Sequence, residues 1–203
     1  MFNKLAASAV DGLQVEPHGD VVVIRFDRPE IRNPLSVDVL ENLIETVELI
    51  SADNRVKALI FTGSGNVFAS GADLREISAV TNDAASQFAL CGQGLMKQID
   101  EVPQLTIAAI NGYCFGGALD LALSCKKRIA SPTARFAHPG AGLGIITGWG
   151  GTQRLPRLVG RTRALEIFFT AEPIDAEHAL AIGLIDEIAD EPLERALSFV
   201  HPR

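Results

Sequence analysis

Apolar residues along the chain follow two spacings: short continuous runs that are typical of buried strands, and runs every three or four residues that are typical of helices. The clearest helical spacing begins after Ser36, a favourable N-cap residue, and continues to about residue 51. Further helices are predicted at residues 83–100, 117–124, 152–159, 163–170, 176–182 and 193–199. Strands are predicted at residues 13–17, 21–26, 56–62, 105–110, 127–130 and 184–189, with a shorter one around Phe136.

The order of these segments predicts the fold class. The first two strands flank the turn His18-Gly19-Asp20 and are expected to form a β-hairpin. Beyond the hairpin, strands alternate with helices, which indicates an α/β architecture. The 203 residues contain no linker, low-complexity segment or repeat, so we predict a single domain over residues 1–203.

Composition narrows the class of protein. The formal net charge is −7 and no basic stripe is visible, which argues against nucleic-acid binding. No apolar run approaches the roughly 18 residues needed to cross a bilayer, and the first segment, MFNKLAASAVDG, makes a poor signal peptide. The three cysteines include no CxxC pair, which favours reduced thiols. We therefore expect a cytoplasmic protein without membrane or nucleic-acid partners.

Motifs of several common enzyme classes are missing from the sequence. It contains no GxSxG, HExxH or GxxxxGK[ST] motif, and its four histidines show no metal-ligand spacing. Gly140, Gly142 and Gly144 resemble a dinucleotide-binding loop, but the third glycine is misplaced and the preceding strand is very short. A nicotinamide enzyme is therefore a weak alternative, and we predict neither a metal ion nor a resident cofactor.

Two segments place small residues where a predicted strand gives way to a helix. They are FASGADL at residues 68–74 and NGYCFGGALDLAL at residues 111–123. Backbone N–H groups at a helix start have no intrahelical partner, and small residues let a ligand atom reach them. Two such groups that converge on one oxygen form an oxyanion hole. Taken singly, each segment is better interpreted as an ordinary tight turn.

Together with two later segments, these motifs resemble the enoyl-CoA hydratase/isomerase (crotonase) superfamily. The later segments are FAHPGAGLGIITGWGGTQRLPRLVG at 136–160 and ALAIGLIDEI at 179–188, and the likeness covers about residues 20–190. The resemblance implies a spiral of ββα units, an acyl-CoA thioester as substrate, and a homotrimer or hexamer. Family chains usually continue past the last strand with several helices, whereas this sequence stops at Arg203, so we expect that helical region to be largely absent.

The resemblance also assigns roles to individual residues. The oxyanion-hole donors would be the N–H groups of Ala72 and Gly117. The segment that lines the coenzyme A site in the family contains Ser70, Gly71, Asp73 and Arg75, and Gly140 is a further substrate-binding position. For Arg75, a plain surface cation is an equally good interpretation.

Both family glutamates are replaced in this sequence. Asp120 stands at the first position, in an otherwise apolar helix, so its carboxylate needs either a partner or a role, and we interpret it as catalytic. Gly140 stands at the second, in FAHPG, which removes half the apparatus for adding water with two carboxylates. His138 is an alternative acid or base; packing as a loop histidine is its other interpretation.

The sequence therefore predicts an enzyme that stabilises a thioester enolate but leaves its reaction open. A single carboxylate, Asp120, suits isomerisation, decarboxylation or thioester hydrolysis better than hydration. The alternative from another class is a non-catalytic acyl-CoA-binding subunit that has kept the fold and lost the chemistry.

Overall fold

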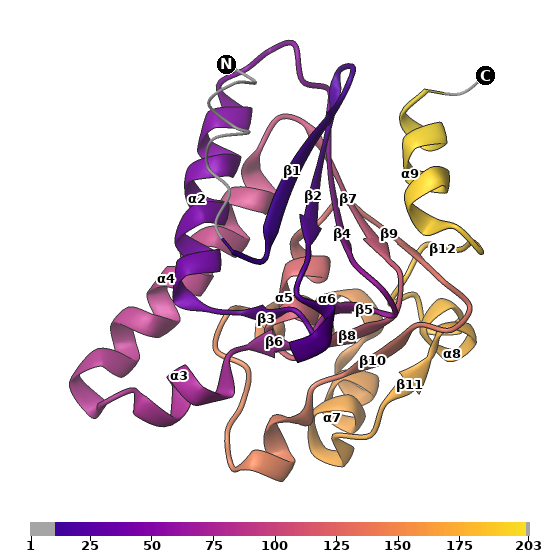
Figure 1. Cartoon of the computed structure of the whole chain (residues 1–203). Helices are drawn as coiled ribbons and strands as arrows, with labels where there is room; N and C mark the ends of the chain where they lie inside the picture. Colours follow the sequence, from indigo (N-terminus) through magenta and orange to yellow (C-terminus); the bar gives the residue numbers. More distant parts are fainter. Residues whose placement is uncertain (1–10, 202–203) are drawn as a thin grey trace.

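A six-stranded sheet forms one half of the computed structural model, which describes residues 11–201 (Figure 1). Its strands lie in chain order, β1-β2-β4-β7-β9-β12, and only the β1–β2 hairpin is antiparallel. Their bounds are β1 (Leu13–His18), β2 (Val21–Phe26), β4 (Ala58–Gly63), β7 (Leu105–Ile110), β9 (Lys127–Ala130) and β12 (Glu187–Ile188).

A smaller sheet of four short strands, in the order β11-β10-β8-β5, lies below the large sheet in Figure 1. Its members are β5 (Val67–Ala69), β8 (Tyr113–Phe115), β10 (Arg135–Ala137) and the antiparallel β11 (Ile174–Asp175). Each of β4, β7 and β9 in the large sheet is followed along the chain by a strand of the small sheet and then by helix. This repetition is the predicted spiral of ββα units. A further pair, β3 (Pro34–Leu35) with β6 (Gly71–Ala72), lies beside it.

Helices cover both faces of the large sheet. The helices are α2 (Val37–Ser51), α3 (Leu74–Ala79), α4 (Asn82–Glu101), α5 (Gly117–Ser124), α6 (Gly151–Val159), α7 (Arg161–Thr170), α8 (Ala176–Ala181) and α9 (Pro192–Val200), with 3₁₀ turns η1 (Pro29–Ile31) and η2 (Pro139–Leu143). Figure 1 shows α9 on the opposite side of the sheet from α2 and α4. Alternate side chains of a strand, such as Ile60 and Phe61, therefore enter two separate apolar clusters. Burial on both faces explains why these strands are continuous apolar runs.

Most predicted elements occur within a few residues of their predicted bounds. The Ser36 hydroxyl accepts a hydrogen bond from the Val39 N–H, as expected of an N-cap. Two predictions were wrong in extent. The last strand spans only Glu187–Ile188 rather than residues 184–189, because the Leu184 N–H bonds back to the Ala179 carbonyl of the preceding turn. The two segments predicted to lead directly from a strand into a helix also contain the short strands β5, β6 and β8.

The ends of the chain limit two further predictions. Residues 1–10, which make up most of the N-terminal segment, lie outside the described part. The single domain predicted over residues 1–203 also includes residues 202–203, which lie outside it too, and stays a prediction. Within residues 11–201, no helix is both long and apolar enough to cross a membrane.

Candidate active site

The two segments predicted to supply oxyanion donors lie against each other. Gly71 has a φ of 89°, and a Cβ placed on it would lie 2.8 Å from the Gly117 nitrogen and 2.7 Å from the Phe115 carbonyl oxygen. Only glycine fits this close approach and this backbone conformation. Strand β6 is thereby held at the first turn of α5, whose N–H groups lack intrahelical acceptors.

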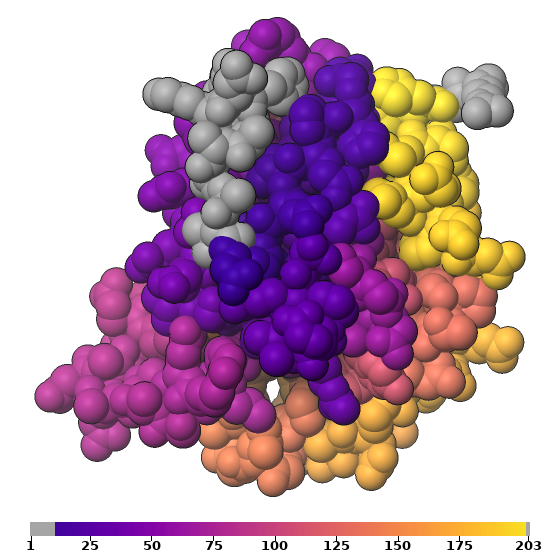
Figure 2. Space-filling model, in the orientation of Figure 1, coloured from indigo at the N-terminus to yellow at the C-terminus, as the bar shows by residue number. Residues whose placement is uncertain are grey.

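A cavity of about 420 Å³ opens beside this junction. Of the predicted residues, Ser70, Ala72, Gly117 and Gly140 line it. Gly71, Asp73, Arg75 and Asp120 are not among the described residues that line it. Figure 2 shows a gap in the surface between the magenta α3 region and the orange segment near residue 140, two parts of the chain that contribute to the cavity wall.

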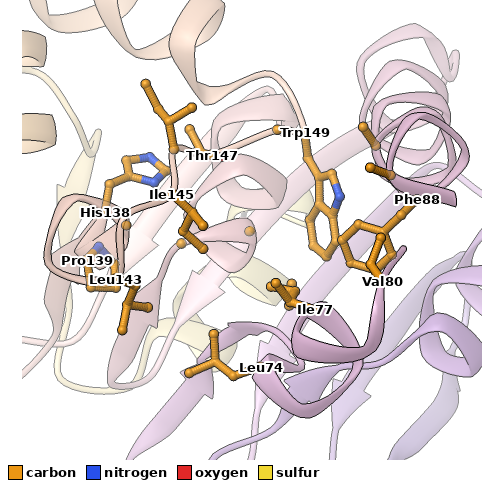
Figure 3. A pocket seen from close by; sticks show the side chains of 18 of the residues that line it. Leu74, Ile77, Val80, Phe88, His138, Pro139, Leu143, Ile145, Thr147 and Trp149 are labelled. Carbon is orange, nitrogen blue, oxygen red and sulfur yellow. The ribbon is translucent and has the colours of Figure 1, made fainter. Parts of the chain in front are cut away.

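The rest of the cavity wall is apolar. In Figure 3 the labelled side chains surround an open space, with His138 at one end and Trp149 at the other. The apolar side chains that line it are Leu74, Ile77, Val80, Phe88, Leu143, Ile145, Ile146 and Trp149. Volume and lining are those of a small-molecule site.

Trp149 depends on two glycines for its position. A Cβ on Gly92 would lie 2.2 Å from the indole, and one on Gly117 would lie 2.3 Å from it. The indole also packs against Phe88, with ring centroids 5.8 Å apart. Gly117 thus has a packing role as well as the predicted binding role. Sequence reasoning missed Trp149 and Phe88 as site residues, since nothing local in the sequence brings α4 and residue 149 together.

Asp120 lies behind the cavity wall, with no exposed surface. Its carboxylate accepts a hydrogen bond from the Thr147 hydroxyl, a partner that the sequence did not reveal. Burial raises the pKa of Asp120 to about 6, although the Thr147 hydrogen bond, nearby N–H groups of Gly151 and Trp149, and the charge of Arg154 act in the opposite direction. The carboxyl group therefore titrates somewhat below neutral pH and is mainly ionised at pH 7.

His138 lies between Asp120 and the cavity. Its side chain lines the cavity and is 3% exposed, and its Nε2 is 3.6 Å from Asp120 Oδ1. The ring packs on Phe168 with centroids 5.0 Å apart. Burial lowers the pKa of His138 to about 4, so the imidazole is neutral at neutral pH. The site thus holds a neutral base beside a buried carboxylate.

Gly140 is enclosed by its own loop. Its carbonyl oxygen accepts a 3.0 Å hydrogen bond from the Ile145 N–H, and a Cβ at this position would lie 2.6 Å from the Ile145 carbonyl oxygen. The site therefore lacks a carboxylate here, and this loop conformation leaves no room for one.

Asp73 and Arg75 interact with each other at the start of α3. The Asp73 carboxylate caps the helix by accepting from the Arg75 N–H, and it also accepts from the Arg75 guanidinium at 2.6 and 3.0 Å. This guanidinium lowers the pKa of Asp73. Arg75 remains largely exposed, so the capping pair supports a local structural role and leaves phosphate contact as a prediction.

Potential metal ligands do not cluster in the part of the chain that the structure describes. Among residues 11–201, no group of three or more His, Cys, Asp or Glu side chains is placed to hold a metal ion.

Comparison with known proteins agrees with the geometry. The enoyl-CoA hydratase/isomerase family model matches residues 16–198. A short-chain-enoyl-CoA hydratase from Clostridium acetobutylicum is 40% identical over 89% of this chain and 69% of its own length. A crotonyl-CoA hydratase from Syntrophomonas wolfei is 38% identical over 89% of this chain and 70% of its own length.

Solved structures show the same fold. The structure of DspI from Pseudomonas aeruginosa has a TM-score of 0.90 and 36% identity, covering 96% of this chain and 82% of that one. An enoyl-CoA hydratase from Bacillus anthracis has a TM-score of 0.89 and 34% identity, covering 93% of this chain and 75% of that one. With its sequence, fold and site in agreement, the chain belongs to the enoyl-CoA hydratase/isomerase family and has the crotonase fold.

Proposed function

We propose that the chain binds an acyl-CoA thioester, with the acyl group in the apolar cavity and the thioester oxygen at the N–H groups of Ala72 and Gly117. The observation that carries this proposal is the shared cavity: Ala72 and Gly117 line one side and aliphatic and aromatic side chains line the rest. The coenzyme A moiety belongs to the substrate, and the proposal includes no resident cofactor or metal ion.

The chemistry that this arrangement supports is enolate formation. Two N–H donors at the thioester oxygen stabilise the negative charge that develops when a bond at the α-carbon breaks. Asp120 and His138 are the titratable pair next to the cavity and are the groups that would handle the proton. Isomerisation and decarboxylation both pass through such a state and need no second carboxylate.

Hydration is a second candidate, because both relatives described above are named hydratases. The enclosed Gly140 argues against it, since a water molecule would lack the second carboxylate that would orient it. A non-catalytic acyl-CoA-binding protein is a third possibility. Measuring both thioester binding and turnover separates these candidates.

The binding proposal can be tested by calorimetry with a non-hydrolysable thioether analogue of an acyl-CoA. Ala89 lines the cavity and Leu90, its neighbour on α4, is exposed and does not. We expect Ala89→Phe to weaken binding at least about 10-fold by filling the cavity, while Leu90→Phe leaves the affinity unchanged. Absence of binding by the unmodified protein at millimolar analogue would overturn the proposal.

We also propose that copies of the chain assemble into a homo-oligomer. Four large apolar side chains are exposed on the consecutive helices α6, α7 and α8, and Phe169 is 77% exposed. Large apolar side chains that are exposed on neighbouring helices are typical of protein interfaces. The four are Leu158, Leu165, Phe169 and Leu180. Light scattering of the unmodified protein and of Phe169→Glu tests this: we expect the substitution to reduce the assembled mass.

A reducing compartment such as the cytoplasm is the setting that we propose for the chain. Cys91, Cys114 and Cys125 are all free thiols, and two of them are buried.

A further inference from the structure

Unsatisfied polar atoms concentrate at one place in the core. Among the described residues, five buried side-chain atoms have no hydrogen-bond partner, and three of them are Asp120 Oδ1 and the two ring nitrogens of His138. Buried polar groups in proteins are normally paired, so such a cluster calls for a specific explanation. Here the unpaired atoms lie beside the cavity that the proposed function assigns to an acyl group.

The His138 ring is held in place from two sides without being hydrogen-bonded. Asp120 from α5 approaches one edge at 3.6 Å, and Phe168 from α7 packs on the ring at 5.0 Å between centroids. The side chain also lines the same cavity as Ala72 and Gly117. The imidazole thus forms part of the cavity wall, and its two unpaired nitrogen atoms are buried within that wall.

Asp120 is less well placed to reach a substrate. It is not among the described residues that line the cavity, whereas His138 is, and one of its carboxylate oxygens already accepts from the Thr147 hydroxyl. The other is crowded by Gly151, where a Cβ would lie 2.1 Å from it. That second oxygen is also the one nearest His138. Any effect of this carboxylate on the cavity therefore passes through a neighbour.

We infer that His138 is the catalytic residue that takes up and returns the α-proton of the bound acyl-CoA, and that Asp120 is a positioning residue that acts through His138. The inference rests on the proposed function and specifies its acid–base group.

The proton and electrons balance without another reactant. The α C–H bond breaks, its proton moves to a ring nitrogen of His138, and its electron pair forms the enolate, whose oxygen is held by the N–H groups of Ala72 and Gly117. Return of the proton reverses the step. The imidazolium formed in between lies next to the Asp120 carboxylate, which stabilises the new charge in a buried setting.

Few other charged groups of the described residues act on Asp120 and His138. From α6, Arg154 acts on Asp120 from a distance, and from β8 the Cys114 thiol stays protonated, because burial and nearby negative charge raise its pKa well above the ordinary value.

The experiment is α-proton exchange of butyryl-CoA in D₂O, followed by NMR. We expect the unmodified protein to catalyse exchange and His138→Gln to lose about 10²–10⁴-fold, the usual contribution of an acid–base group, with unchanged affinity for the thioether analogue. His178→Gln is the control, since His178 is exposed on α8 away from this cavity, and its exchange rate should not change.

Asp120→Asn tests the positioning role. It keeps the size of the side chain but removes the charge next to the imidazolium, so the exchange rate should fall without a change in affinity. The pH profile should also change, because the unmodified protein loses the Asp120 charge as the pH falls through about 6, the pKa of this carboxyl group, and the variant has no such charge to lose. A purely structural Asp120 would leave the pH profile where it was.

Several results would overturn the inference. Exchange by His138→Gln within about threefold of the unmodified protein would do so, as would an unmodified protein that binds the analogue but catalyses no exchange. Absence of binding would instead contradict the proposed function itself. If His138→Gln does not fold, His138→Phe retains a ring against Phe168 and must show the same loss.

Discussion

Burial changes proton binding at Asp120 and at His138 in opposite directions. The pKa of Asp120 is raised to about 6, so its contribution to folding stability is fully present at low pH and is lost as the pH rises towards 6. The pKa of His138 is lowered to about 4, so its contribution is present above about pH 6.5 and is lost as the pH falls towards 4. Between about pH 4 and 6 the two effects oppose each other.

Single substitutions should therefore separate the two opposing effects of pH on folding stability. Relative to the unmodified protein, Asp120→Asn should become more stable as the pH rises from 4 to 6, and His138→Gln should become less stable over the same window. The stability difference between each variant and the unmodified protein should change by up to about 1.4 kcal/mol per pH unit. Urea unfolding at several pH values measures both. Stability differences that do not vary with pH would show that neither group is shifted as described.

The sequence allowed part of the site to be predicted at this scale. Four predicted residues line the cavity: Ser70, Ala72, Gly117 and Gly140. They could be predicted because each belongs to a short contiguous motif. Thr147 could not be identified, because its contact with Asp120 spans 27 positions and depends on how a glycine-rich loop folds back. The catalytic roles of the predicted residues remain predictions.

At the scale of the elements, the 3₁₀ turn η2 limits which side chains fit at position 140. A glutamate at this position would have to displace the Ile145 carbonyl, whereas Gly142, two positions on, has open space around it. We expect Gly140→Glu to destabilise the fold by about 1–3 kcal/mol and Gly142→Glu to have little effect. Thermal unfolding of the two variants makes this comparison.

The same argument bears on hydration. We expect the unmodified protein to hydrate crotonyl-CoA poorly and Gly140→Glu not to restore the activity, since the loop must move before a carboxylate can enter the site. Rapid hydration by the unmodified protein would show that the second carboxylate is dispensable here.

Helix α4 contains a natural pair of test positions. A Cβ at Gly92 would meet the Trp149 indole at 2.2 Å, whereas one at Gly94 would meet no atom within 4 Å. Gly94→Ala should stabilise the helix by about 0.5–1 kcal/mol, and Gly92→Ala should destabilise the protein by displacing the indole. Trp149 is the single tryptophan of the chain, so its fluorescence reports directly on that displacement. An unchanged emission spectrum in Gly92→Ala would contradict this account.

Element prediction succeeded where apolar periodicity is long. It missed most of the short strands, although the one predicted around Phe136 is confirmed as β10. The helix ending at Ser51 and the strand Leu105–Ile110 extend over enough residues to show their spacing. The strands of the small sheet have two or three residues each, which is too short for an alternation to appear. Their pairing comes from the spiral as a whole, which the family resemblance supplied and the local pattern did not.

On the scale of the whole molecule, α9 completes the cover of the large sheet. Ala196 of α9 is fully buried in the apolar cluster on that face, whereas Ser198 on the same helix is exposed. Ala196→Asp would bury a carboxylate without a partner, and we expect a loss of about 3–5 kcal/mol. Ser198→Asp should change the stability little. Equal unfolding temperatures for the two variants would show that α9 contributes little to the fold.

The sequential order of the large sheet has a consequence for how the protein forms during synthesis. Because β1, β2, β4, β7 and β9 add one after another at the same edge, each newly made segment finds its neighbouring strand already in place. The cavity is completed later than the first strands, since its walls come from residues 70 to 149 and therefore from three successive turns of the spiral. A ribosome-bound chain that ended before Trp149 emerged would contain most of the sheet and an incomplete cavity wall. Folding in this protein can therefore begin early, whereas the cavity is complete only after Trp149 has been added.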